Sequence, residues 1–259
     1  PNNIISNGPI HNTTIQRVEE ELNKLKSLEV FVAPTTVSNG LKGLEKLYKC
    51  IDDLLNLPQT LHALSQSLHA KWVEDLLDKS MRLLDLCGTT RELVSQCKEN
   101  VRDLQSSLRR RKGDSTTDDN VTRFYSFSKK IKRNAKRLVL TLKQMDQDTT
   151  VSVLLDADQD TIAVIRALKE ANAECISTFQ MLLSFLCVPL LKPKESKWSL
   201  LSRLVNKERI ASLVLAEKMS LETRLESFET YLVSFEDGLE VTFICLIRSR
   251  SSILNVFSC

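Results

Sequence analysis

The sequence predicts an all-α fold, an elongated helical bundle of six to eight helices, and its composition gives two reasons. Its 259 residues include only six Gly and six Pro, so the chain has few places to turn. Leucine, a strong helix former, occupies 42 positions, whereas aromatic residues make up only 5%. Because sheet-rich folds need many turns and many β-branched or aromatic residues, these numbers nearly exclude an all-β protein.

Apolar residues that recur every three or four positions define the expected helices. The first residues, 1–12, show no such period and are predicted to form a flexible N-terminal arm, followed by a single helical domain over 13–259. Gly88 stands where a helix C-terminal cap is expected. Within the domain we expect an acidic loop at 113–120 and a linker at 189–197. The predicted helices cover about 13–33, 41–57, 58–87, 89–112, 121–145, 151–188, 198–205 and 208–259.

The last helix carries apolar residues in alternating steps of four and three, the spacing of a coiled-coil seam. The seam becomes irregular at Thr242 and Ser249, and Gly238 predicts a bend. Two interpretations stay open: the helix packs inside its own bundle, or the 221–239 seam joins a second copy in a homo-oligomer. The seam residues are Leu221, Leu225, Phe228, Leu232, Phe235 and Leu239.

No motif of a known catalytic or metal site occurs in the chain. His62 and His69 are seven residues apart, which on a helix is two turns, about 10 Å, too far to share one metal ion. The seven cysteines show no C-x-x-C spacing and sit among leucines, so they are predicted to be reduced, buried thiols. Trp72 lies on the apolar face of the predicted 58–87 helix and is also predicted to be buried. We therefore expect a non-enzymatic protein with no catalytic residue, no cofactor and no metal.

Charge is distributed unevenly along the chain. Residues 89–145 contain fifteen Lys/Arg and six Asp/Glu, whereas residues 217–240 contain two basic and seven acidic residues. Two basic clusters flank the predicted acidic loop and form a candidate surface for an anion or a partner. Its residues are Arg109, Arg110, Arg111, Lys112, Lys129, Lys130, Lys132, Arg133, Lys136 and Arg137.

Four interpretations of this surface compete. It is a solvated face partly neutralised by the acidic C-terminal helix, a site for anionic lipid headgroups, or a surface for protein partners or nuclear import. Nucleic-acid binding is the least favoured, because no nucleic-acid motif accompanies the basic residues. The longest uncharged run, 175–191, is too short to span a membrane and contains Pro189. The expected location is therefore cytoplasmic, with peripheral membrane or nuclear association as alternatives.

Five segments carry a recognisable pattern: LEKLYKCIDDLLNLP at 44–58, KWVEDLLD with LLDLC over 71–87, DLQSSLRRRK at 103–112, WSLLSRL at 198–204 and FEDGLE at 235–240. Together, in this order, they resemble a plant-specific family, domain-of-unknown-function family 241, related to the BYPASS proteins. The resemblance implies a link with root and shoot development and no established activity, cofactor or binding residue. The expected function is that of a non-enzymatic interaction or scaffold protein. The alternative is a peripheral membrane protein that binds anionic lipid through its basic helix.

Ser115 and Thr116 are candidate phosphorylation sites between the two basic clusters, with acidic residues three positions downstream of each. A phosphate would add about −1.5 to −2 charges and compete with an acidic partner or lipid for the same guanidinium groups. We expect the Ser115→Asp/Thr116→Asp variant to bind anionic vesicles more weakly, with a smaller salt dependence, than Ser115→Ala/Thr116→Ala. Equal affinities, with no phosphate on protein from plant tissue, would identify an unmodified polar segment.

Overall fold

A computed structural model describes residues 9–28, 33–65, 71–109, 116–147, 159–188 and 207–258 of the chain. Within these ranges every element of regular structure is an α-helix, so the predicted all-α class is confirmed. The seven helices there are α1 (Pro9–Lys26), α2 (Pro34–Leu55), α3 (Pro58–Ser65), α4 (Lys71–Arg109), α5 (Thr116–Gln147), α6 (Gln159–Leu186) and α8 (Lys207–Ser258).

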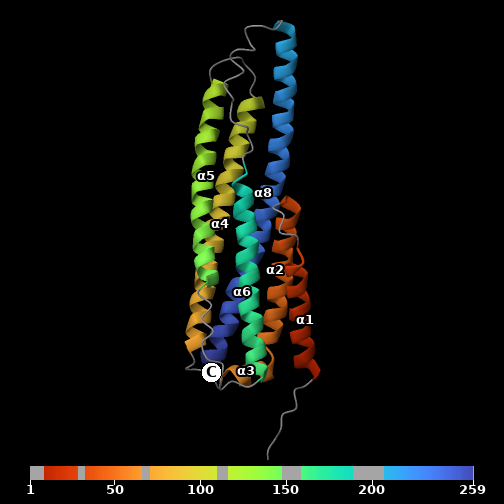
Figure 1. The fold of residues 1–259 in the computed structure, drawn as a ribbon, viewed down its shortest axis with the longest axis vertical. Helices are drawn as coiled ribbons and strands as arrows, with labels where there is room; N and C mark the ends of the chain where they lie inside the picture. The colour runs from red at the N-terminus through yellow and green to blue at the C-terminus, as the bar shows by residue number, and fades with distance from the viewer. Residues whose placement is uncertain are drawn as a thin grey trace, which may run out of the picture.

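The long helices form one elongated bundle in which successive helices run in opposite directions (Figure 1). Helix α8 runs along most of the bundle and packs mainly against α4 and α2. Helix α5 packs against α6 and α4 in the upper part of the view, whereas α1 packs against α2 and α6 in the lower part. The short helix α3 lies at the lower end, near the C-terminus. The bundle therefore has two unlike ends.

Helix α2 is held very close to its neighbours by three glycines, of which Gly43 faces the Leu25 side chain of α1. A Cβ atom added at Gly238 of α8 would lie 2.9 Å from Leu41 Cδ1 and 3.0 Å from Leu41 Cβ. A Cβ atom added at Gly40 of α2 would lie 3.0 Å from Cγ2 of Thr178 on α6. These distances are shorter than ordinary carbon–carbon contacts, so the missing side chains let the helix backbones approach. Gly238 therefore serves packing, and α8 continues through it as one helix.

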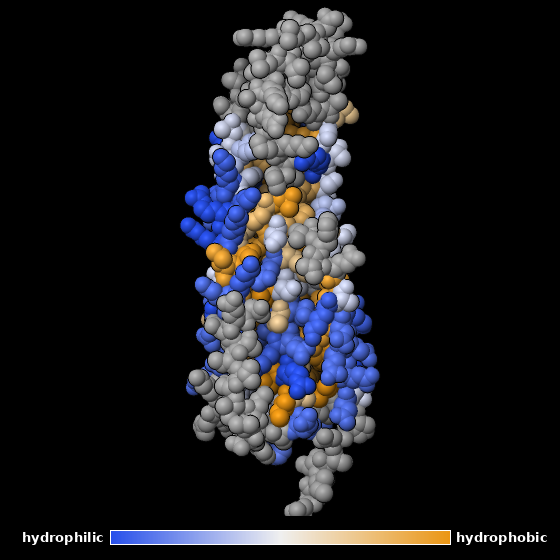
Figure 2. Space-filling view, in the orientation of Figure 1, coloured by the Kyte–Doolittle hydropathy of each residue, from blue (hydrophilic) through white to orange (hydrophobic). Residues whose placement is uncertain are grey.

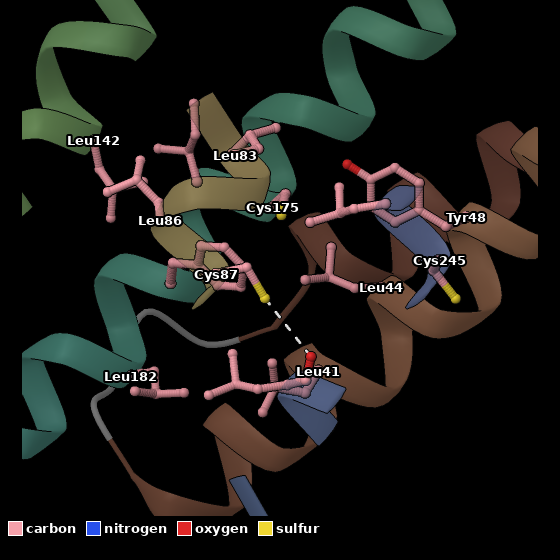
Figure 3. Packing of buried hydrophobic residues seen from close by; sticks show 14 of the residues in the cluster. Leu41, Leu44, Tyr48, Leu83, Leu86, Cys87, Leu142, Cys175, Leu182 and Cys245 are labelled. Carbon is pink, nitrogen blue, oxygen red and sulfur yellow. Dashed lines mark hydrogen bonds between the residues drawn. The ribbon is translucent and has the colours of Figure 1, made fainter. Parts of the chain in front are cut away.

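The centre of the core is built from leucines, thiols and one tyrosine (Figure 3). The Cys87 thiol donates a hydrogen bond to the Leu239 carbonyl oxygen at a distance of 3.6 Å. The buried Tyr48 hydroxyl donates to Asn172 Oδ1 at 3.3 Å. Leu41 and Leu44 fill the space beside Cys87, and both are at most 1% exposed. Burial of such a leucine contributes about 1.5–3 kcal/mol, so this layer ties α2, α4, α6 and α8 together.

The burial expected for Trp72 and for most of the cysteines is confirmed within the described ranges. Trp72 is 6% exposed and belongs to the core cluster. Of the six cysteines in the described ranges, five are buried, Cys187 is half-buried, and none is in a disulfide. Cys259 lies outside those ranges.

The predicted helix boundary at Gly88 is wrong. Helix α4 continues from Lys71 to Arg109 without a break and so joins most of the two predicted helices, 58–87 and 89–112. The first residues of the predicted 58–87 helix form the separate helix α3. A glycine inside a helix costs about 1 kcal/mol relative to alanine. The apolar face of α4 on both sides of Gly88 is buried, which outweighs that cost. The hydroxyls of Thr89 and Thr90 bond to carbonyls four residues back, within the same helix.

Other boundaries also differ from those expected. Helix α1 begins at Pro9, so the last four residues of the predicted 1–12 arm are helical. It ends at Lys26, before the predicted 33, and Pro34 begins α2, a position that its fixed φ angle favours. Helix α5 begins at Thr116, inside the predicted 113–120 loop, because acidic residues are favourable in the first turn of a helix. The predicted 189–197 linker and 198–205 helix lie outside the described residues.

The heptad seam of α8 is buried within a single chain. Leu225, Leu232, Phe235 and Leu239 are fully buried, Phe228 is 9% exposed and Leu221 is half-buried. The buried stripe continues through Thr242, whose hydroxyl bonds to the Gly238 carbonyl at 2.8 Å. A polar residue is thus accommodated at an irregular point of the seam. None of the helices in the described ranges has a stretch sufficiently long and apolar to cross a membrane.

Alanine substitutions at two glycines should have opposite effects on stability. Gly238→Ala forces its new methyl group into Leu41, and overpacking of this kind costs about 1–3 kcal/mol. This exceeds the gain of about 1 kcal/mol in helix propensity, so the free energy of unfolding should fall. Gly88→Ala is the matched control, because a Cβ atom there would meet nothing within 4 Å. It should gain stability. Urea unfolding followed by circular dichroism measures both, and equal stability of the two variants would contradict the close approach.

Candidate anion-binding surface and adjacent cleft

Four ion pairs join α4 to the acidic part of α8. Because the two helices are antiparallel, the partners occur in opposite order along α4 and α8. Arg102 Nε lies 2.6 Å from Glu229 Oε1, and the other three pairs are spaced one or two turns apart along the helices. The pairs are Arg91–Glu240, Lys98–Glu236, Arg102–Glu229 and Arg109–Glu226. The acidic surplus of residues 217–240 is therefore directed onto α4.

One of these pairs has a predictable pH dependence. The hydrogen bond from the Arg102 guanidinium lowers the pKa of the Glu229 carboxyl. A carboxyl with a lowered pKa in the folded state stabilises the fold above its unfolded pKa. That contribution is lost as the pH falls through the folded pKa, so the α4–α8 contact weakens in acid. Exposed ion pairs are each worth only about 0–1 kcal/mol.

Six of the eight basic residues of helix α5 cluster over residues 129–137, and the acidic helix does not neutralise them. All six side chains are exposed, and within the described residues none of them forms an ion pair. Their spacing places Lys129, Lys132 and Lys136 on one ridge of the helix and the other three on a second, outer ridge. The basic face of α5 is defined here as Lys129, Lys130, Lys132, Arg133, Lys136 and Arg137.

The structure separates the candidate residues that the sequence had grouped. Arg109 lies on α4 and is paired with Glu226 at 3.2 Å. Arg110, Arg111, Lys112 and Ser115 lie outside the described residues. Thr116 is the first residue of α5. The six residues of the basic face are therefore the part of the predicted surface that the described helices bring together.

An apolar cleft of about 280 Å³ lies beside the basic face. Four helices or their ends supply its walls, with Lys129 and Lys132 belonging to both the cleft and the basic face. In Figure 2, hydrophilic side chains over α5 lie beside an apolar area near the upper end of α6. The lining residues are Cys97, Val101, Phe124, Tyr125, Phe127, Ser128, Lys129, Ile131, Lys132, Leu186, Cys187, Val188 and Phe228.

The end of α6 places a thiol at the wall of this cleft. Helix α6 ends at Leu186, and the next two residues close the last turn with short-range backbone hydrogen bonds. Burial raises the pKa of the Cys187 thiol, while the nearby Lys132 and Lys136 ammonium groups partly oppose the rise. Burial raises the pKa of Cys97, on the opposite wall, to about 12. Cys187 is therefore the more reactive of the two thiols.

Sequence reasoning did not identify the cleft. Phe124 and Phe127 lie three residues apart, a helical spacing typical of core residues, and Phe124 is indeed buried. The wall residues come from four segments that are far apart in the sequence, and no local pattern reports their meeting. Within the described residues, no three His, Cys, Asp or Glu side chains gather closely enough to hold a metal ion.

The fold and this surface define a class: an all-α bundle protein with one uncompensated basic face beside an apolar cleft. The family model described as Protein BPS1 matches residues 40–256, from α2 almost to the end of α8. The chain therefore belongs to the BPS1 family, as its resemblance to the BYPASS-related plant proteins indicated. This membership makes it a plant protein related to development. Neither the curated proteins nor the solved structures contain a match.

The cysteines should differ widely in reactivity in the folded protein. Cys87 is fully buried and its pKa is raised to about 12, so it holds almost no thiolate. Cys187 is half-buried near two lysines and should react first with iodoacetamide. Mass spectrometry of a labelling time course measures this order. Lys132→Glu/Lys136→Glu should slow the Cys187 reaction, and denaturant should remove the difference. Equal labelling of Cys87 and Cys187 in the native state would contradict the packing described.

Proposed function

We propose that this chain is a non-enzymatic interaction protein of plant development that holds an acidic segment of a protein partner on the basic face of α5. The observation that carries the proposal is the contrast between two basic helices. The basic residues of α4 that face α8 are paired with its glutamates, whereas the six on α5 have no ion pair within the described residues.

The electrostatic consequence supports an anionic partner. The formal net charge of the whole chain is only +3, so its basic surplus is local. Six exposed cations lie within about three helical turns on one rigid helix packed against α4 and α6. A surface of one sign speeds encounter with partners of opposite sign and disfavours partners of like sign. Charge complementarity therefore selects an acidic partner.

A second candidate function is attachment to an anionic membrane surface. One observation favours it: Leu140 is 61% exposed and follows the basic face by one turn, on the side of Lys136 and Arg133. An apolar side chain among basic residues suits the boundary between lipid headgroups and acyl chains. Basic residues near an anionic bilayer contribute about 1 kcal/mol each. The same helix face would then contact lipid.

The proposal predicts that reversing the outer ridge abolishes binding of an acidic peptide. Lys130→Glu/Arg133→Glu/Arg137→Glu should weaken binding of a labelled polyglutamate peptide at least tenfold, because attraction becomes repulsion. Lys42→Glu/Lys46→Glu/Arg166→Glu is the matched control: it makes the same charge change at three exposed positions that form no ion pair within the described helices. It should change affinity less than threefold. Fluorescence anisotropy over a salt series measures both.

Vesicles separate the two candidates. If Leu140→Ser weakens binding to phosphatidylserine vesicles but leaves peptide affinity unchanged, the membrane function is favoured. Equal loss of peptide affinity in the α5 variant and in the control variant would mean that only net charge matters, and the proposed site would be wrong. Proximity labelling in root tips with the wild type and the α5 variant then identifies the partners that depend on this face.

A further inference from the structure

We propose that the cleft between α4, α5, α8 and the end of α6 binds a single-chain anionic amphiphile. Its hydrocarbon chain would lie against the apolar walls, and its phosphate or carboxylate headgroup would contact Lys129 and Lys132. This goes beyond the proposed function, which concerns the outer ridge of α5 and a macromolecular partner.

The walls of the cleft suit a hydrocarbon chain. The chain contains nine phenylalanines, and three of them, Phe124, Phe127 and Phe228, line this one cleft. Aliphatic side chains from α4 and α5 complete the walls. The volume of about 280 Å³ is near the lower limit, about 300 Å³, of typical small-molecule sites. A slender ligand fits this volume better than a broad one.

The apolar path does not end at this cleft. A second cleft of about 470 Å³ shares two wall residues with it, Val188 and Phe228, and adds Phe185 and Tyr231. Its other wall residues are polar or charged: Ser220, Thr223, Arg224 and Ser227. The aromatic rings of Phe185 and Phe228 are stacked with their centres 5.5 Å apart. A hydrocarbon chain longer than the first cleft can accommodate can therefore continue along the aromatic side of the second.

The charged groups of the first cleft specify the headgroup. Its lining includes two lysines and no acidic residue. Both lysines lie on the same wall, on the ridge of α5 that faces α6, so the cleft has one cationic side. The Cys187 thiol lies 3.9 Å from the Lys132 carbonyl oxygen, and both residues line the cleft, so this lysine lies beside the end of α6. An anionic headgroup beside Lys129 and Lys132 would neutralise charges that no described carboxylate neutralises.

A purely structural role for these lysines makes a different prediction. The C-terminus of a helix carries partial negative charge, and cations near the end of α6 stabilise it by about 0.3–1 kcal/mol. In that case the lysines serve the fold, the cleft needs no ligand, and amphiphiles bind without dependence on headgroup charge.

Dodecyl phosphate, used below the concentration at which it self-associates, tests the inference. Isothermal titration should give one molecule bound per chain. Val188→Trp, at a 54% exposed position on the shared wall, should weaken binding at least tenfold by filling the cleft. The matched control is Val233→Trp, at a 37% exposed position on α8 that lines neither cleft, and it should leave the affinity unchanged.

The headgroup is tested separately. Lys129→Glu/Lys132→Glu should weaken the affinity for dodecyl phosphate at least tenfold and change the affinity for the neutral dodecyl maltoside less than threefold. Lys129→Arg/Lys132→Arg should retain binding of dodecyl phosphate. Circular dichroism confirms that each variant is folded. Unchanged affinity of Val188→Trp would show that the chain lies elsewhere, and equal effects on both amphiphiles would assign the lysines to the fold. Either result overturns the inference.

The remaining outcomes also decide it. More than one molecule per chain, or binding only when the probe self-associates, would indicate adsorption of surfactant and would overturn the inference. If Val188→Trp weakens binding of the polyglutamate peptide and leaves binding of dodecyl phosphate unchanged, the cleft binds a protein partner and the inference is wrong. The variant Lys130→Glu/Arg133→Glu/Arg137→Glu keeps this test separate from that of the proposed function. This variant should abolish binding of the polyglutamate peptide and retain binding of dodecyl phosphate, because the outer ridge of α5 does not line the cleft.

Discussion

The antiparallel contact between α4 and α8 is the constraint on which the other features depend. Its interior is the buried heptad seam of α8, and its exposed margin is the row of four ion pairs. The glutamates of α8 pair with α4, whereas the basic face of α5 forms no ion pair within the described residues. Phe228 of the same seam also supplies one wall of the cleft. The α4–α8 contact therefore bears on both the charge of the surface and the shape of the cleft.

Much of the fold could be predicted from the sequence because the spacing of apolar residues along a short segment is enough to indicate a helix. The period of buried leucines placed α2, α6 and α8 to within several residues, and the family model covers residues 40–256. The helix boundary predicted at Gly88 was wrong because a glycine inside a helix costs only about 1 kcal/mol relative to alanine. Burial of the apolar residues on either side of it contributes more than this. The packing role of Gly238 could not be predicted, because its close approach to Leu41 joins residues almost two hundred positions apart.

The candidate site divides in the same way. The six residues of the basic face could be named from their spacing on one helix. The pairing of α4 with the acidic stretch could not, because it requires knowing which helices are neighbours. Sequence alone allowed the acidic helix to neutralise either basic cluster. The cleft was invisible for the same reason, since its lining combines residues from α4 to α8.

The late position of α8 in the chain has a consequence for synthesis. The hydrophobic faces of α2 and α4 close only when α8 arrives, and Cys87 finds its hydrogen-bond partner 152 residues downstream. At about 5–20 residues per second, the ribosome needs roughly eight to thirty seconds to travel from the end of α2 to the start of α8. During that interval leucines such as Leu41 and Leu54 lack their final cover on the α8 side. Nascent-chain chaperones are therefore expected to hold this protein until its last fifth has been translated.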